Sequence, residues 1–203
     1  MKKLFITLSI CLIITTVKTQ AQNGRLSLGV ELALPAGDFG KSAGTGFGGS
    51  FRFEQPILNK LGLTGTLGFI TFSKKTVSTV VGKYEYRNAM IPIQGGLKYY
   101  FKEAQEGFYV MAEVGVHVFT AKVSSPAYTF GGITVSSTEE TNSKTNLSYA
   151  PEIGYHLSNL DFGLRYQLFS YQTTVSSGTT TVAKTSTQGY LGIRVAYVFG
   201  SRK

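Results

Sequence analysis

Apolar residues alternate with small or polar ones along the stretch "RLSLGVELAL", residues 25–34. Leu26 and Leu34 fall on one side of an extended chain, whereas Gly29 and Glu31 fall on the other. Strict alternation of this kind predicts a β-strand with two unlike faces. The environment of each face then decides what kind of β-protein this is.

Seven further windows show the same alternation, and most approach the roughly 9–11 residues that a tilted strand needs to cross a bilayer. No stretch with a helical period of 3.6 residues stands out. The chain is therefore predicted to be all-β, with eight strands. The windows are 26–34, 47–53, 61–69, 91–101, 108–118, 147–157, 160–168 and 191–199.

One face of these windows is apolar throughout, with no charge, amide, Ser or Thr. The opposite face holds a glycine in every window and charges of both signs. The glycines are Gly29, Gly48, Gly68, Gly96, Gly115, Gly154, Gly163 and Gly192. The charges are Glu31, Glu54, Glu113, Glu152, Arg52, Lys98, Arg165 and Arg194.

The mixed face is typical of the lumen of a narrow membrane barrel. An eight-stranded barrel is only wide enough to be filled by side chains, so small residues must alternate with large ones. Enclosed charges must be paired, because an unpaired buried ion costs several kcal/mol. We predict an eight-stranded antiparallel up-and-down transmembrane β-barrel with a plugged lumen, through which transport is not expected. The alternative is a soluble, exported, ligand-binding β-barrel with its apolar face inward.

The connections between the windows alternate in length, with 12, 7, 21, 6, 28, 2 and 22 residues. Bacterial outer-membrane barrels have short periplasmic turns and longer outer loops. The predicted periplasmic turns are 54–60, 102–107 and 158–159. The predicted outer loops are 35–46, 70–90, 119–146 and 169–190.

Two of the outer loops contain hairpin signals, Gly131-Gly132 in "YTFGGITVSS" and Ser177-Gly178 in "TTVSSGTTTV". We predict that strands continue beyond the membrane as a protruding Thr-rich sheet, whose edge binds foreign protein by strand addition. The alternative is that these loops are only solvated surface. Pro92 and Pro151 lie inside strand windows, where the missing backbone donor predicts bulges.

The first 21 residues are typical of a cleaved export signal. A basic start precedes an apolar run at 4–17, which is shorter than the about 20 residues of a membrane-spanning helix. A retained anchor is the alternative. The only cysteine, Cys11, lies within this segment. The predicted organisation is a signal peptide at 1–21 and a barrel domain at 22–203, located in the outer membrane of a Gram-negative bacterium after export through the periplasm.

Removing residues 1–21 takes away three lysines and no acids, so the formal net charge falls from +9 to +6. No stripe of interleaved basic and aromatic residues accompanies this charge, and nucleic acid is not an expected partner. Cations gather in the loop at 70–90 and predict contact with lipopolysaccharide phosphates; the alternative is a solvated face. These cations are Lys74, Lys75, Lys83 and Arg87.

Candidate acids and bases are few, and no metal-ligand spacing or Gly-rich phosphate loop appears. His156 and Asp161 flank the turn at 158–159, where a structural cross-strand pair is expected. His117 has no acidic partner beside it in the sequence. We therefore predict no catalytic, cofactor-binding or metal-binding residues. A lipid-modifying or proteolytic membrane enzyme is the less favoured alternative.

Several segments together resemble a known class of protein. They are "GVELALPAGDFG" (29–40), "MIPIQGGLKYYF" (90–101), "FYVMAEVGVHVF" (108–119), "PEIGYHLSNLDFGLRYQ" (151–167) and "YLGIRVAYVFG" (190–200). The sequence resembles small outer-membrane β-barrels of the OmpA/OmpX type, and within them the PorT-like barrel proteins. The resemblance implies a structural or interaction role: adhesion, lipopolysaccharide contact or assistance to secretion. The expected partners are outer-membrane lipid, lipopolysaccharide and another envelope or host protein.

Overall fold

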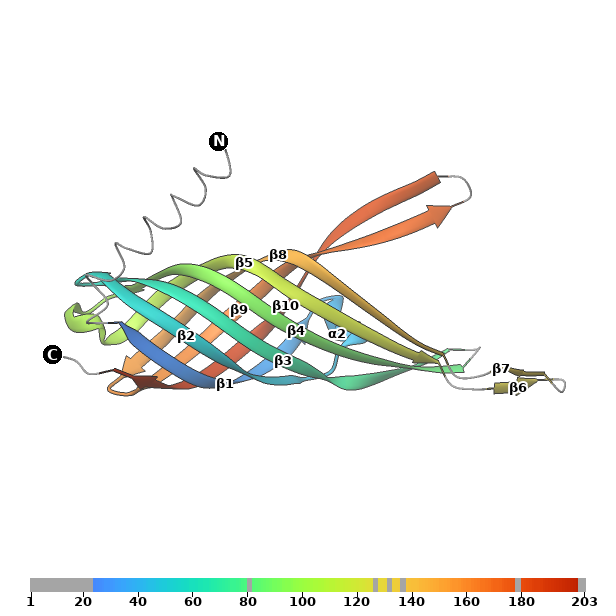
Figure 1. Cartoon of the computed structure of the whole chain (residues 1–203), viewed down its shortest axis with the longest axis horizontal. Helices are drawn as coiled ribbons and strands as arrows, with labels where there is room; N and C mark the ends of the chain where they lie inside the picture. The colour runs from blue at the N-terminus through green and yellow to red at the C-terminus, as the bar shows by residue number, and fades with distance from the viewer. Residues whose placement is uncertain are drawn as a thin grey trace, which may run out of the picture.

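A computed structural model describes residues 24–79, 82–125, 128–130, 133–135, 138–177 and 180–200; the predicted signal segment lies outside them. Within these residues, eight antiparallel strands close into a barrel in the order β1-β10-β9-β8-β5-β4-β3-β2 (Figure 1). None of the described helices is long and apolar enough to cross a membrane. The barrel strands are β1 (Arg25–Ala36), β2 (Gly46–Leu58), β3 (Leu61–Thr79), β4 (Gly82–Tyr100), β5 (Gly107–Ser125), β8 (Thr138–Leu157), β9 (Leu160–Ser177) and β10 (Thr180–Phe199). The other elements are α2 (Phe39–Ser42), the 3-10 helix η2 (Glu103–Gln105), β6 (Tyr128–Phe130) and β7 (Ile133–Val135).

The predicted eight-stranded antiparallel barrel is confirmed, and each predicted window falls on its own strand. Closure comes from β1 and β10, which pair from Leu26 with Phe199 to Ala36 with Gly189. The described chain therefore begins and ends at one end of the barrel, here called the terminal end. The opposite end is called the distal end.

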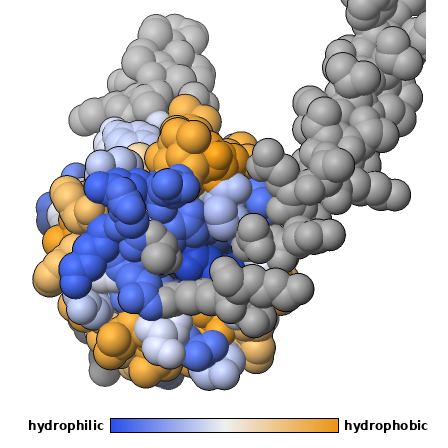
Figure 2. All heavy atoms as spheres, turned by 90° about the vertical axis from the view of Figure 1, so that its left-hand side faces the viewer, coloured by the Kyte–Doolittle hydropathy of each residue, from blue (hydrophilic) through white to orange (hydrophobic). Residues whose placement is uncertain are grey.

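The apolar face of every barrel strand points outward. Val30, Leu58 and Phe108 are 70%, 67% and 67% exposed, and large apolar side chains of all eight strands share this exposure. Viewed from the terminal end, hydrophilic residues gather in the middle and hydrophobic ones around the rim (Figure 2). The soluble alternative required the apolar face inside, so the structure contradicts it.

Three of the four predicted outer loops, 70–90, 119–146 and 169–190, are mostly strand, and the sequence predicts strands in the last two; the connection at 35–46 contains α2 instead. β3 and β4 stay paired up to Thr79 and Gly82, and β9 and β10 up to Ser177 and Thr180. β5 and β8 pair up to Ser125 and Thr138, and the chain between them contains the small β6–β7 hairpin. The predicted protruding strands are therefore present. The predicted turn at 131–132 lies outside the described residues, as does Gly178 of the turn predicted at 177–178, whereas Ser177 is still paired with Thr180.

The distal strands separate into two bodies. Among the described residues, β8 and β9 do not pair beyond Ser148 and Phe169, and β1 and β10 do not pair beyond Ala36 and Gly189. The distal parts of β9 and β10 form a hairpin that diverges from the other strands (Figure 1). We call it the outer hairpin (170–177 and 180–188), and we call the distal parts of β3, β4, β5 and β8 the outer sheet.

The predicted bulges at Pro92 and Pro151 are wrong. The pairing register is the same on both sides of each proline, so the missing donor interrupts the ladder without adding a residue. Register shifts occur instead between Pro56 and Leu58 in β2, and between Phe72 and Lys75 in β3.

Glycines on the inner face give a direct test of how closely the strands approach one another. A Cβ on Gly115 would overlap the carbonyl oxygen of Ile93 on the neighbouring strand, so Gly115→Ala is expected to destabilise the barrel by several kcal/mol. A Cβ on the outward-facing Gly65 would meet no atom within 4 Å. Gly65→Ala is therefore expected to stay within about 1 kcal/mol of the parent protein. Urea unfolding in lipid vesicles measures both, and equal losses would contradict the packing described here.

Candidate functional site

A bidentate ion pair spans the middle of the barrel. Arg52 on β2 donates to both carboxylate oxygens of Glu152 on β8, at 2.9 and 2.8 Å. Both side chains are 2% exposed or less. Pairing between a guanidinium and a carboxylate in this geometry is the strong form of a charged hydrogen bond. It links strands that are not neighbours in the sheet.

The terminal half of the lumen is organised around Asp161 on β9. Lys98 Nζ lies 2.6 Å from one Asp161 carboxylate oxygen, and Arg194 lies 3.3 Å from the other. His156 lies 3.4 Å from Asp161, which agrees with the cross-strand pair expected from the sequence. The Tyr109 hydroxyl lies 2.9 Å from Asp161 and 2.8 Å from Glu152, so it joins this group to the central pair.

A second acidic group closes the terminal end. Glu54 on β2 lies 2.7 Å from Arg25 and 3.3 Å from Lys98. The Tyr100 hydroxyl donates to the same carboxylate at 2.9 Å. Arg25 also donates to the side-chain oxygen of Gln105 in η2, so the connection between β4 and β5 is drawn into the network.

The distal half of the network consists of the charged residues not yet described and of two threonines on β3. Arg165 Nη2 lies 2.5 Å from Glu31 and donates to the Tyr190 hydroxyl at 3.2 Å. Glu113 accepts hydrogen bonds from Thr64 and Thr66 of β3, at 3.2 and 2.6 Å. Each of the eight barrel strands thus contributes at least one side chain to the network.

Charges of the two signs are balanced among the buried lumen residues that the structure describes. The eight predicted lumen charges all lie inside the barrel, and the structure adds one cation and one acid to them. All ten are at most 6% exposed. The cations are Arg25, Arg52, Lys98, Arg165 and Arg194, and the acids are Glu31, Glu54, Glu113, Glu152 and Asp161.

The two additional charges had weak sequence signals. Arg25 precedes the first alternating window, and Asp161 stands beside the tight turn at 158–159, where the sequence predicts only a cross-strand pair with His156. Alternation itself was the usable signal, because both residues continue the inward-facing positions of their strands.

An apolar cluster lies beyond the charges at the distal end, and the sequence did not predict it. The short helix α2 turns the Phe39 side chain into the barrel, where its ring contacts Phe72, Phe119 and Phe169 at centroid distances of 4.9, 5.9 and 5.3 Å. We call this group the distal cluster. Its buried members are Ala33, Phe39, Ala43, Ile70, Phe72, Met90, Phe119, Phe169 and Tyr190.

Polar contacts hold α2 against the barrel strands around it. Gly44 N–H donates to the Ser73 carbonyl at 3.2 Å, and Ser73 N–H donates to the Thr45 carbonyl at 2.9 Å. The amide of Asn88 donates to the Ser42 carbonyl at 3.0 Å. The segment therefore lies over the distal mouth as an ordered element.

The four cations predicted to contact lipopolysaccharide have different surroundings. Lys74 lies 3.0 Å from Glu85, and Arg87 lies 3.9 Å from it, with both cationic side chains more than half exposed. Lys75 donates instead to the Gly40 carbonyl in α2. The side chain of Lys83 lies outside the described part of the structure. The structure thus brings two of the four together around one carboxylate, and contact with lipopolysaccharide stays a prediction.

The histidines considered as acid or base groups are both buried. His117 is 0% exposed, and its ring lies 4.7 Å from that of Phe169 in an edge-on contact. His156 belongs to the network around Asp161. Among the described residues, no group of three His, Cys, Asp or Glu side chains is placed to hold a metal ion.

Solved structures show which fold this chain shares. Ail, the attachment invasion locus protein of Yersinia pestis, superposes with a TM-score of 0.53 at 16% identity, covering 88% of this chain and 99% of that one. A structure of Ail in complex with the heparin analogue sucrose octasulfate gives the same TM-score and identity, with 87% and 98% covered. The outer membrane protein OprG of Pseudomonas aeruginosa gives 0.50 at 13% identity, with 88% and 97% covered. The sequence matches no protein-family model and no curated protein. The fold is thus that of small outer-membrane β-barrels, and the narrower OmpA/OmpX and PorT-like resemblance stays a prediction.

Buried and exposed ion pairs are expected to differ sharply in their contribution to stability. Glu152→Gln leaves Arg52 without its bidentate partner inside the barrel, and a loss of about 3–5 kcal/mol in the free energy of unfolding is expected. Glu85→Gln removes the partner of an exposed lysine and is expected to cost about 1 kcal/mol or less. Urea titration of both variants in the same detergent measures the difference. Similar losses would contradict a network held by buried charge pairing.

Proposed function

We propose that this protein is a non-enzymatic interaction protein of the Gram-negative outer membrane, and that its distal strands bind other proteins. The observation that carries the proposal is the pair of open edges on the outer hairpin. Neither the distal part of β9 nor that of β10 has a second neighbouring strand among the described residues.

Placement in the outer membrane is supported by the fold and by the apolar belt, which is the ring of outward-facing apolar side chains on the eight barrel strands. Only helices and closed barrels satisfy all backbone polar groups inside hydrocarbon, and the pairing of β1 with β10 closes this barrel. Both ends of the described chain lie at the terminal end, which suits the periplasmic side. The distal end then faces the cell exterior.

A plugged lumen is supported by two independent groups of side chains. Ten balanced charges occupy the terminal and central parts, and the distal cluster around Phe39 occupies the mouth. The interior of an eight-stranded barrel is filled by side chains of this size. Solute transport is therefore not part of the proposed function.

A non-enzymatic role is supported by the surroundings of the histidines. The His117 ring is fully buried beside Phe169, and His156 lies within the lumen charges. Neither imidazole faces a surface on which a lipid or peptide substrate would bind.

Strand addition is supported by the composition of the outer hairpin. An isolated two-stranded hairpin is only marginally stable in water, and natural proteins protect open edges with lysine or proline. Residues 170–188 contain a single charged residue, Lys184, and no proline. A partner strand that pairs with β9 or β10 would satisfy backbone groups and stabilise the hairpin.

Anionic partners form a second, compatible class. Lys74 and Arg87 lie on the outer sheet, and the likeness to Ail includes a complex with a sulfated heparin analogue. This supports contact with lipopolysaccharide or with an anionic host polymer. A role in secretion follows only from the PorT-like resemblance.

Closure of the lumen can be measured with an engineered cysteine in the distal cluster. The chain from residue 22 onward contains no cysteine, so Met90→Cys provides a single reporter. We expect a water-soluble maleimide to label this cysteine slowly, and at least tenfold faster when Phe39→Ala removes the central ring of the cluster. Heat-modifiable gel mobility verifies that both variants are folded. Rapid labelling of Met90→Cys alone would contradict the plug.

Photo-crosslinking in intact cells tests the interaction role. Crosslinking amino acids at positions 141 and 174, on the two sides of the gap between β8 and β9, are expected to yield adducts of defined mass. Replacing residues 173–184 by Asn-Gly shortens the hairpin at the pair Gln172–Thr185, which removes position 174, and should abolish the adducts formed from position 141.

The matched control replaces residues 126–137 by Asn-Gly at the pair Ser125–Thr138, which leaves the outer hairpin intact. Adducts should persist in this variant. Loss of the adducts in both variants, or identical adducts from the periplasmic turn at 158–159, would reject strand addition. Release of the parent protein without detergent would reject the membrane location.

A further inference from the structure

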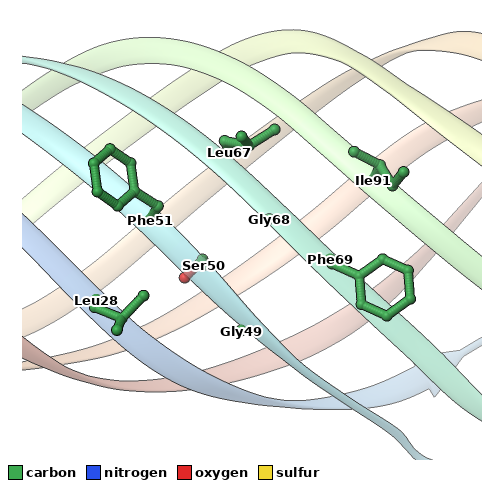
Figure 3. Close-up of a pocket in the computed structure, with 8 residues that line it drawn as sticks. All are labelled: Leu28, Gly49, Ser50, Phe51, Leu67, Gly68, Phe69 and Ile91. Carbon is green, nitrogen blue, oxygen red and sulfur yellow. The ribbon is translucent and has the colours of Figure 1, made fainter.

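A groove of about 370 Å³ lies on the outward face of the barrel, across β1, β2, β3 and β4 (Figure 3). Gly49 forms part of its floor, and side chains from all four strands surround it. The surrounding apolar side chains are Leu28, Phe51, Leu67, Phe69 and Ile91.

The groove exists because Gly49, the outward position between Phe47 and Phe51 on β2, has no side chain. Gly49 pairs with Val30 on one side and with Phe69 on the other. Phe69 and Leu67 are 54% and 51% exposed, so they rise above the floor as a wall. The shape is a shallow apolar channel of a kind that suits an extended hydrocarbon chain.

A basic cluster lies on the same strands toward the distal end. Lys74 is five residues beyond Phe69 on β3, and Arg87 is four residues beyond Ile91 on β4. At about 3.3 Å per residue, these steps correspond to roughly 13–17 Å along the strands. Lys122 on β5 lies opposite Arg87 in the pairing register of β4 and β5, and it adds a third cation.

The register shift in β3 places the lysine that completes this cluster. Strict alternation from Leu67 and Phe69 would turn Lys75 outward. The shift between Phe72 and Lys75 reverses the alternation, so Lys74 projects toward Glu85 on β4 and Lys75 turns to the Gly40 carbonyl. Among the described residues, Lys74, Arg87 and Lys122 therefore lie on this exposed surface together with Glu85.

We propose that the groove and the basic cluster together bind one phosphorylated acyl lipid of the outer leaflet, of the lipid A type. A phosphate contacts Lys74 and Arg87, and an acyl chain of the same molecule lies in the groove. Cations next to an apolar surface are the complement of an anionic amphiphile. This inference rests on the proposed outer-membrane location, because only that location brings the distal end to the outer leaflet.

Native mass spectrometry of protein refolded in lipid-free detergent tests the site. With bis-phosphorylated lipid A as the probe, we expect one molecule to be retained. The same lipid without phosphates should bind at least fivefold more weakly. Lys74→Gln with Arg87→Gln should weaken binding about tenfold, and Leu67→Ala with Phe69→Ala about fivefold.

Two matched controls distinguish binding of lipid A at this site from non-specific binding of lipid elsewhere on the barrel. Leu147 and Ile153 lie on the other side of the barrel and are each 58% exposed. Their double alanine variant should bind within twofold of the parent protein, as should Lys60→Gln with Lys102→Gln on the terminal-end turns. Equal weakening by these controls, or equal binding of the phosphate-free lipid, overturns the inference. Binding of inorganic phosphate alone that blocks lipid A shows a phosphate site only and overturns it too.

Vesicle insertion distinguishes failure of the lipid site from failure of the membrane location. If the refolded parent protein inserts into vesicles, shows heat-modifiable mobility and binds no lipid A, only the lipid site is rejected. If it stays in solution without detergent, the membrane location is rejected as well.

Discussion

Charge pairing inside a closed cylinder is the interaction on which the rest of this structure depends. Ten acidic and basic side chains share the lumen, and none is more than 6% exposed. An uncompensated buried ion costs several kcal/mol, so each charge needs its counterpart in place. Because the partners come from all parts of the barrel wall, the network is complete only when the first and last strands have met. Completion of the network is thus coupled to closure of the sheet.

The inward glycines make room for this network. A Cβ on Gly163 would fall 2.6 Å from Glu152 Oε1, and one on Gly192 would fall 3.0 Å from both Arg165 and Glu31. The long charged side chains therefore lie over strand positions that have no side chain of their own. This packing is the reason that glycines alternate with charged residues on the inward face. The charged side chains of the barrel wall are then inside, and the outward face is apolar.

Features of the fold that repeat along the chain are predictable from the sequence, whereas those that depend on distant contacts are not. Strands, faces and the lumen charges follow a period of two, which is visible residue by residue. The α2 segment has no period, and its position depends on distant partners such as Phe119 and Phe169. The register shift in β3 turns Lys74 outward in place of Lys75, and no residue pattern in the sequence indicates that shift. Prolines were misleading, because a missing donor interrupts a ladder without inserting a residue.

The sheet is closed where hydrocarbon surrounds the strands and open where water does. At the height of the apolar belt, an open edge would expose backbone polar groups to hydrocarbon, and all eight strands pair there. Beyond Ser148 and Phe169, both strand faces carry polar residues, and water can satisfy an unpaired edge. The divergence of the outer hairpin marks this boundary. The closed section contains the barrel parts of β9 and β10, so it sets the direction in which the open edges of the outer hairpin point.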